Sequence, residues 1–179
     1  MAALVIRVVI PEPPPRPKAP KGALAELFGT REYAIRALLV MIVGTVGIAG
    51  AGNAAYWLPN LVDAASEGVP ASEVAARKTF ATIIMHIGTL GGVFFFPWLA
   101  KQVGRRMSLT LGFVLALMVT PVLLILGSTY ERILIIWPLV AFCAIGVSAV
   151  YGLYFPELFP SRIRATGAGF GYNTARLLQ

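Results

Sequence analysis

Long apolar stretches alternate with short polar segments along this chain, and this pattern predicts membrane-spanning helices. Four stretches are long enough to cross the ~30 Å hydrocarbon core, since a helix rises ~1.5 Å per residue. They cover residues 37–59, 80–100, 107–126 and 133–155. A fifth run, 163–179, contains Arg176 and is only marginally long enough to span. The predicted fold class is an all-α integral membrane protein, a polytopic helical bundle of four full spans and the start of a fifth.

Residues 1–36 are predicted to connect this bundle to whatever precedes it. Residues 1–10 are apolar but contain Arg7, and they stop at Pro11, which makes them too short to span. The proline-rich stretch that follows cannot be helical and is expected to be extended. Residues 23–36 carry charges of both signs and are predicted to form a short interfacial helix.

The composition excludes a soluble globular domain. Hydrophobic residues make up 58% of the 179 positions and charged residues only 13%, against roughly 25% charged in an average soluble domain. The mean hydropathy of +0.78 agrees. The one cysteine, Cys143, has no partner in the chain, so no disulfide framework is predicted.

The net charge of +7 reflects 15 Lys and Arg against 8 Asp and Glu, and the bases occur mostly in the segments between the apolar stretches. With the N-terminus in the cytoplasm, 11 bases lie inside and 3 outside, and Arg176 in the fifth run completes the 15. This imbalance predicts a multi-pass protein of the cell or inner membrane with a cytoplasmic N-terminus. The bases therefore face anionic lipid headgroups, and nucleic acid is not predicted as a partner.

Polar side chains within the spans predict which helices face a cavity. The third span holds only Ser108, Thr110 and Thr120, whose hydroxyls can bond to the helix's own carbonyls, so it is expected to face lipid. Polar groups in hydrocarbon are costly unless they face protein or water, so the other four spans should surround a cavity. The candidate substrate-cavity residues are Asn53, Tyr56, His86, Tyr151, Asn173 and Arg176.

Each of these residues has alternative roles. His86 could accept a proton or bond a substrate, or it could be a core histidine bonded to a neighbouring helix. Arg176 is always charged, so it needs a carboxylate, a group of carbonyls or an anionic ligand, unless it snorkels to the membrane surface. All eight acids lie in loops or at their edges, so proton coupling would depend on His86 or on residues outside this chain. No metal-ligand cluster, nucleophile with its base or phosphate-binding loop is recognisable, so neither enzyme activity nor a cofactor or metal is predicted.

Glycines recur at helical spacing within three spans. Such residues let helices approach closely and also let them bend, so these glycines have two alternative roles: static packing of the helices and bending during a conformational change. The glycines concerned are Gly44, Gly47, Gly50, Gly52, Gly88, Gly92, Gly167 and Gly171.

Three segments resemble a known family. The sequence Leu-Ala-Lys-Gln-Val-Gly-Arg-Arg at 99–106 resembles the G-x-x-x-D-R-x-G-R-R loop of the major facilitator superfamily. Residues 154–170 resemble the loop after the tenth helix of its metabolite:proton and sugar porters, where E-x-F-P-x-x-x-R-x-x-G recurs. Residues 55–59, Ala-Tyr-Trp-Leu-Pro, resemble the outer end of the seventh helix in sialic-acid-like and aromatic-acid-like members.

The resemblance implies that the spans correspond to the seventh to tenth helices and the start of the eleventh. Residues 2–12 then resemble the end of the sixth helix and its Pro-Glu loop. The chain would be a fragment, and its partners would be the missing N-terminal half, the lipid bilayer, a small-molecule substrate and possible protons. The implied function is transport of an organic anion or sugar-like metabolite by alternating access. A small homo-oligomeric transporter or channel, and a membrane scaffold that transports nothing, are the alternatives.

The resemblance also assigns a cytoplasmic gating charge cluster to Arg105, Arg106, Glu157 and Arg164. In the family such charges separate and reform as the two halves rock. Lys101 stands where the family has aspartate, so a latch built on that aspartate is not expected here. The alternative is that all are solvated loop charges, worth at most ~1 kcal/mol each.

Overall fold

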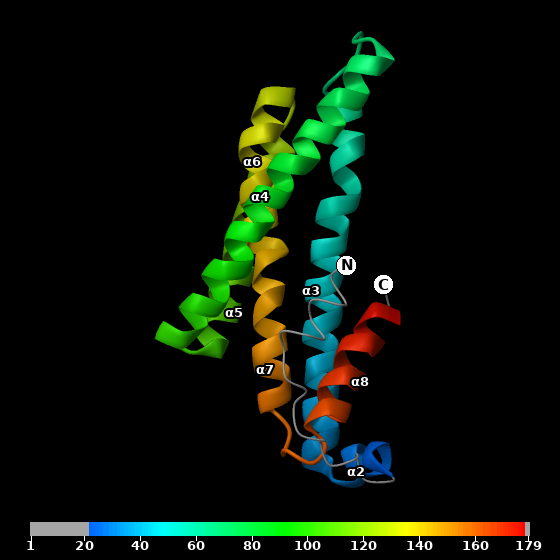
Figure 1. Ribbon diagram of the computed structural model, residues 1–179, viewed down its shortest axis with the longest axis vertical. Coiled ribbons are helices and arrows are strands. Elements are labelled where there is room, and N and C mark those ends of the chain that lie inside the picture. The colour runs from blue at the N-terminus through cyan, green and yellow to red at the C-terminus, as the bar shows by residue number, and fades with distance from the viewer. Residues whose placement is uncertain (1–21, 178–179) are drawn as a thin grey trace, which may run out of the picture.

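The described residues of the computed structural model, 22–177, are helical throughout except for short turns (Figure 1). No strand occurs among them. The elements are α2 (Ala23–Gly29), α3 (Arg31–Ala64), α4 (Ala71–Val103), α5 (Arg105–Leu126), α6 (Tyr130–Ala144), η1 (Gly146–Val150), α7 (Tyr151–Glu157) and α8 (Arg164–Leu177). The expectations for the proline-rich stretch and for the run before it fall on residues 1–21, outside the described range.

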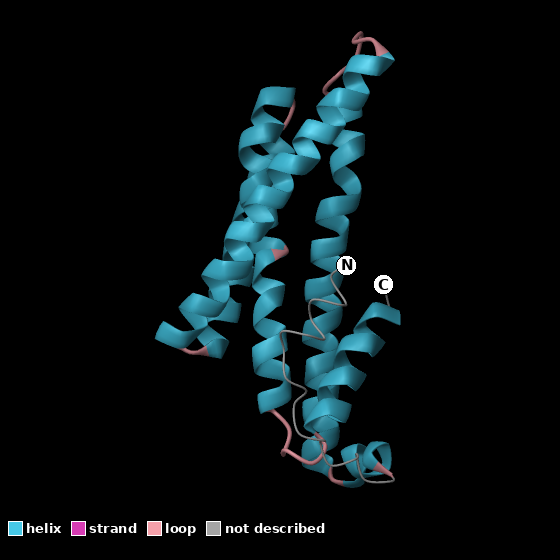
Figure 2. Cartoon of the chain, viewed as in Figure 1, coloured by secondary structure: helices cyan, strands magenta, loops and turns pink. Residues whose placement is uncertain are grey.

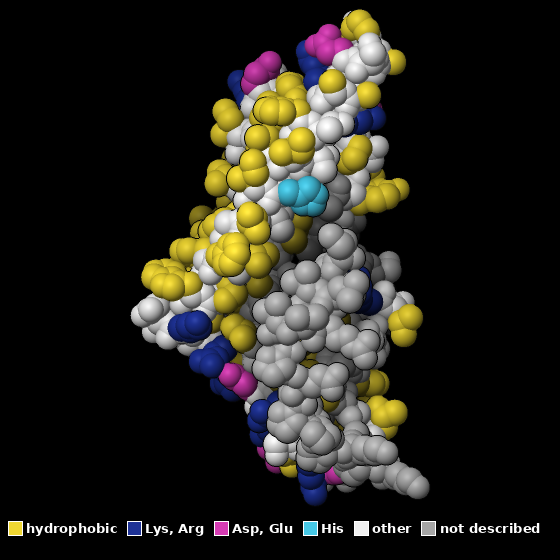
Figure 3. Space-filling view, viewed as in Figure 1, with side chains coloured by type: hydrophobic (Ala, Val, Ile, Leu, Met, Phe, Trp, Pro, Cys, Tyr) yellow, Lys and Arg dark blue, Asp and Glu magenta, His cyan; other side chains and the backbone are white. Residues whose placement is uncertain are grey.

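The prediction of four spans is confirmed. The helices long and apolar enough to cross a membrane are Arg31–Gly50 within α3, Ala71–Val103, Arg105–Leu126 and Tyr130–Glu157. Helices α3 and α4 have 34 and 33 residues, more than a bilayer core requires. They extend past the predicted ends because the polar residues beside the apolar stretches continue the same helices. Charged side chains accordingly gather at the two ends, with hydrophobic side chains between them (Figure 3).

The helix predicted before the first span is shorter than expected, and its position at the membrane surface stays a prediction. The helix expected over 23–36 ends at Gly29, and Arg31 already begins α3. Thr30 has extended backbone, and its hydroxyl accepts a hydrogen bond from the Tyr33 amide at 3.4 Å. A threonine in this role caps a helix start, which separates the two helices.

The fourth span is one rod with an interruption (Figure 2). Helix α6 ends at Ala144, η1 follows as a 3-10 helix, and α7 continues in the same direction. The Ser148 hydroxyl donates to the Ile145 carbonyl at 2.6 Å. Tighter winding and a side-chain bond to the backbone both change the helical ladder here, and mid-helix 3-10 stretches often mark functional positions.

Helix α5 lies at the edge of the bundle, where it contacts α4, α6 and η1. The side chains of Leu117, Leu124 and Ile125 are each more than 70% exposed. Leu117 and Leu124 also line a pocket of about 720 Å³ between α3, α5 and α6, so the lipid-facing position of α5 stays a prediction. Thr110 and Thr120 bond to carbonyls of their own helix, as expected. Ser108 does not: it is fully buried and donates to the Phe96 carbonyl of α4 at 2.9 Å.

Two groups of buried side chains form the core. One joins Phe96, Val147, Tyr151 and Phe155 near the α8 end, and the other surrounds Trp137 near the opposite end. Trp57 and Trp98 are exposed, as an interfacial aromatic belt requires. Trp137 is buried instead, so its placement in that belt is corrected.

Glycines bring the helices into close contact. A Cβ on Gly146 of η1 would lie 2.5 Å from the Gly92 Cα of α4, and one on Gly44 of α3 would lie 3.1 Å from Ala175 of α8. The small residues therefore serve packing between these helix pairs. Their part in bending stays a prediction.

Candidate functional site

A pocket of about 550 Å³ lies where α4, the broken fourth span and α8 meet. Three of the four spans predicted to surround a cavity thus contribute to it. Its lining is mostly apolar, and Ser148, Tyr151 and Tyr172 are the lining residues whose side chains carry a polar group. The remaining lining residues are Val93, Ala149, Gly152, Phe155, Pro156 and Ala168.

Tyr151 contributes its aromatic ring to the pocket, and its hydroxyl is not available there. The residue is 1% exposed, and its ring stacks on Phe155 with centroids 4.9 Å apart. The hydroxyl points against Gly47 of α3 and has no hydrogen-bond partner within the described structure. Gly47 has to be a glycine here, because a Cβ would collide with that hydroxyl.

Arg176 and Tyr172 form a local pair on α8. The guanidinium carbon lies 5.8 Å from the centre of the Tyr172 ring, a cation–π geometry that the spacing of four residues allows. Both side chains are exposed, and Tyr172 also lines the pocket. An exposed cation thus stands beside the pocket. Asn173 is exposed too, and its amide donates to the Gly169 carbonyl at 2.8 Å.

The other predicted cavity residues lie apart from this pocket. His86 is exposed on α4, seven residues before Val93 and therefore on the same helix face two turns away. Tyr56 is 72% exposed near the far end of α3 and meets the Trp57 ring edge-to-face. Asn53 belongs to α3, and its side chain is outside the described structure.

Sequence reasoning missed Ser148 and Tyr172 as pocket residues. The sequence could have indicated Tyr172, because this residue lies four residues before Arg176, the charged residue of the fifth run. It gave little indication of Ser148, since the hydroxyl of a serine in an apolar helix ordinarily bonds to a carbonyl of its own helix. Its position became notable only through the 3-10 winding.

Three of the four predicted gating charges meet at the end of the bundle near α2. An Arg105 guanidinium nitrogen lies 2.8 Å from a Glu157 carboxylate oxygen, which joins α5 to α7. Arg106 donates from Nε to the Tyr154 hydroxyl at 3.1 Å. Arg164, the first residue of α8, is exposed and has no ion pair among residues 22–177.

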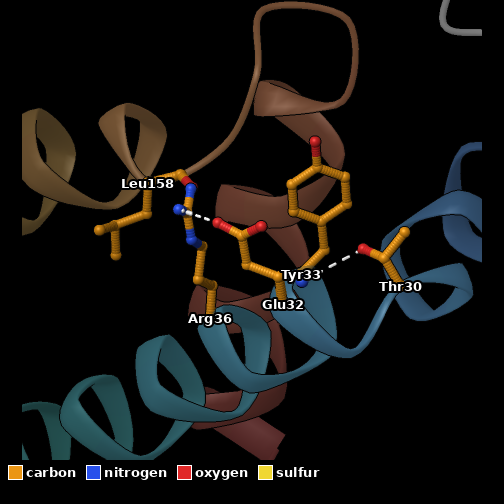
Figure 4. Close-up of polar contacts among 5 residues, drawn as sticks. All are labelled: Thr30, Glu32, Tyr33, Arg36 and Leu158. Atoms are coloured by element: carbon orange, nitrogen blue, oxygen red, sulfur yellow. Dashed lines mark hydrogen bonds and ion pairs between the residues drawn. The ribbon is translucent and has the colours of Figure 1, made fainter.

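Further charges at this end were not predicted as part of the cluster. Arg36 pairs with Glu32 and also donates to the Leu158 carbonyl at 2.7 Å, so it ties α3 to the turn after α7 (Figure 4). Arg162 of the following turn lies 2.5 Å from Glu26 of α2. Residues at 26–36 and 157–162 are thus joined by contacts that no sequence spacing indicates.

A second group of charges joins the opposite ends of three helices. Lys78 of α4 lies 2.6 Å from Asp63 of α3. The neighbouring Arg77 pairs with Glu73 and lies over the Tyr130 ring of α6, 5.0 Å from its centre. The ends of α3, α4 and α6 are therefore connected to each other at this side.

The fold and these contacts define a class: a multi-pass α-helical membrane protein. The chain is similar to the probable 4-methylmuconolactone transporter of Cupriavidus pinatubonensis (strain JMP 134 / LMG 1197), with 34% identity over 161 residues. That alignment covers 89% of this chain and 36% of the relative. The niacin transporter NiaP of Acinetobacter baylyi (strain ATCC 33305 / BD413 / ADP1) is 28% identical over 121 residues, which cover 68% of this chain and 26% of that protein.

These relatives confirm the resemblance to transporters that the motifs predicted, and both are named as transporters and not as enzymes. The chain spans 36% of the length of the first relative and 26% of the length of the second. No family model and no solved structure matches it.

Proposed function

We propose that this chain is part of a major facilitator transporter that carries a small, ring-bearing organic carboxylate across a membrane. The observation that carries the proposal is similarity over 89% of the chain to a transporter named for a lactone metabolite. Niacin, in the name of the second relative, is a carboxylate on an aromatic ring. A carboxylate of this kind needs a cation and an apolar surface, and Arg176 beside the aromatic pocket supplies both.

In this proposal residues 1–36 form the cytoplasmic connector and residues 37–179 part of one transmembrane half. The other half comes from the rest of the polypeptide, and the N-terminus of this chain is cytoplasmic. A substrate between the halves touches Tyr172 and Ser148 while its carboxylate pairs with Arg176. Transporters of this architecture bind near the midplane and rock two halves around the site.

The charge cluster at the α2 end acts as a gate in this scheme. The Arg105–Glu157 and Arg36–Leu158 contacts hold the α5, α7 and α3 ends of this half together, and they orient the surface that closes against the other half. His86 serves as the proton acceptor if uptake is driven by protons, since the described spans hold no other imidazole and no carboxylate at depth. Asn53, Tyr56 and Asn173 bond the substrate or its water along the same path.

Uptake by the full-length protein tests the proposal. Proteoliposomes containing the protein are supplied with labelled niacin, nicotinamide or a neutral sugar, with and without an inward proton gradient. We expect saturable uptake of the carboxylate and little uptake of its uncharged amide. Equal uptake of niacin and nicotinamide would exclude a carboxylate-selective site.

Variants of Arg176 locate the selectivity. Arg176→Ala should abolish carboxylate uptake, and Arg176→Lys should retain a part of it, because a lysine keeps the charge but not the planar fork. Arg132→Ala is the matched control, since it removes an exposed arginine at the start of α6. Unchanged uptake in Arg176→Ala would show that Arg176 does not bind the substrate. In the same assay, His86→Gln tests whether uptake is coupled to protons through His86.

A further inference from the structure

One face of α4 is an exposed apolar strip that ends on a lysine. Ile87, Leu90, Phe94 and Trp98 follow each other at spacings of three or four residues, and all are more than half exposed. Lys101 comes three residues after Trp98 and continues the same face. An apolar strip with a tryptophan and then a lysine at its end is the pattern of a helix that leaves hydrocarbon for the headgroup layer.

The chain turns back immediately after this lysine. Gly104 alone separates α4 from α5, and its φ of +90° is a conformation that glycine adopts without strain. The turn therefore holds Lys101, Arg105 and Arg106 within six residues, and all three are exposed. The buried Ser108 bond to α4 fixes the two helices against each other beside them.

The charges at this turn are not balanced within the described structure. Arg105 pairs with Glu157, and Arg106 uses its Nε on Tyr154, which leaves its two terminal nitrogens unused. Across residues 22–177 no carboxylate pairs with Lys101. Three bases against one acid leave an excess of two positive charges next to exposed Trp98 and Met107.

We propose that the α4–α5 turn is a binding site for the headgroup of an anionic phospholipid. The lipid phosphate lies between Lys101 and the free nitrogens of Arg106, and its acyl chains run along the strip from Trp98 to Ile87. Anionic headgroups attract membrane-adjacent bases by about 1 kcal/mol each, and basic sites between helices bind such lipids. This proposal is independent of the transported substrate.

The test uses full-length protein in nanodiscs of phosphatidylcholine, with or without phosphatidylglycerol. Spin-labelled forms of the two lipids give their relative association with the protein surface. We expect preference for phosphatidylglycerol in the wild type, reduced about fivefold in Lys101→Gln and further in Lys101→Glu, since 1 kcal/mol corresponds to about that factor. Arg132→Gln removes one exposed charge at the other end of the bundle and should change the preference less.

Thermal unfolding in the same nanodiscs gives a second readout. Phosphatidylglycerol should raise the unfolding midpoint of the wild type and of Arg132→Gln more than that of Lys101→Gln. If Lys101→Gln lowers the midpoint equally in both lipids, Lys101 pairs with protein and the proposal is overturned. It is also overturned if inorganic phosphate raises the unfolding midpoint in phosphatidylcholine nanodiscs as much as phosphatidylglycerol does, because the site would then bind a free anion. A third contrary result is that Arg132→Gln reduces the lipid preference as much as Lys101→Gln.

Discussion

Arg105 at the start of α5 and Glu157 at the end of α7 form an ion pair with 2.8 Å between nitrogen and oxygen. They are 52 residues apart in sequence. Both side chains are more than 40% exposed, so solvent screens the pair and its contribution to stability is at most ~1 kcal/mol. Its position between two helix ends, more than its strength, makes it a candidate gate.

Reversal of these two charges tests the gate. Arg105→Glu and Glu157→Arg should each slow uptake several-fold, because each places like charges at the helix ends. The double variant should recover most of the rate, while unfolding midpoints change little throughout. Proteoliposome uptake and thermal scans measure both quantities. Single variants that transport normally would show that the pair is only a solvated surface contact.

The hydroxyl of Ser108 should stabilise the α4–α5 contact. Ser108→Ala removes the hydrogen bond that the buried Phe96 carbonyl accepts from α5, which predicts a loss of about 1 kcal/mol of unfolding free energy. Thr110→Ala is the control: Thr110 is exposed and bonds only to its own helix, so a change within ±0.5 kcal/mol is expected. Denaturant unfolding in detergent measures the difference. Equal losses in the two variants would contradict a specific role of the interhelical bond.

Close contact of α4 with η1 predicts that Gly146 tolerates no side chain. Gly146→Ala sets a methyl group 2.5 Å from the Gly92 Cα, and backbone cannot move away as a flexible side chain could. We expect a loss of 1–3 kcal/mol or more, the usual range for overpacking. Gly50→Ala serves as the control, since nothing lies within 4 Å of its added Cβ. A Gly146→Ala protein as stable as Gly50→Ala would show that the helices can separate at little cost.

Tyr151→Phe distinguishes a packing role from a substrate contact. The hydroxyl is buried without a partner, so its removal should leave stability unchanged or raise it by about 1 kcal/mol. Uptake should then persist, because the stacked ring remains on Phe155. A variant of normal stability that fails to transport would place the hydroxyl in the substrate path, and a large loss of stability would reveal a hydrogen bond.

The spans and their approximate ends could be predicted from the sequence, since apolar length and helical rise leave few alternatives. Their true lengths could not, because polar residues such as Arg31 and Asp63 continue α3 beyond the apolar part. The resemblance of residues 99–106 and 154–170 to family motifs was enough to assign Arg105, Arg106 and Glu157 to one charge cluster. The contacts of Arg36 with Leu158 and of Arg162 with Glu26 depend on how the turn after α7 folds back against α2 and α3.

By itself the sequence determined that this is a polytopic helical membrane protein, with basic ends and a few polar groups at depth. Only the tertiary structure decided that Trp137 and Ser108 are buried between helices, while Trp98 and Leu117 are exposed. The physical reason is that lipid and protein interior are both apolar, so hydrophobicity cannot distinguish the face of a helix that meets lipid from the one that meets another helix. Packing makes that choice, and it also brought Tyr172, Ser148 and Tyr151 to one pocket.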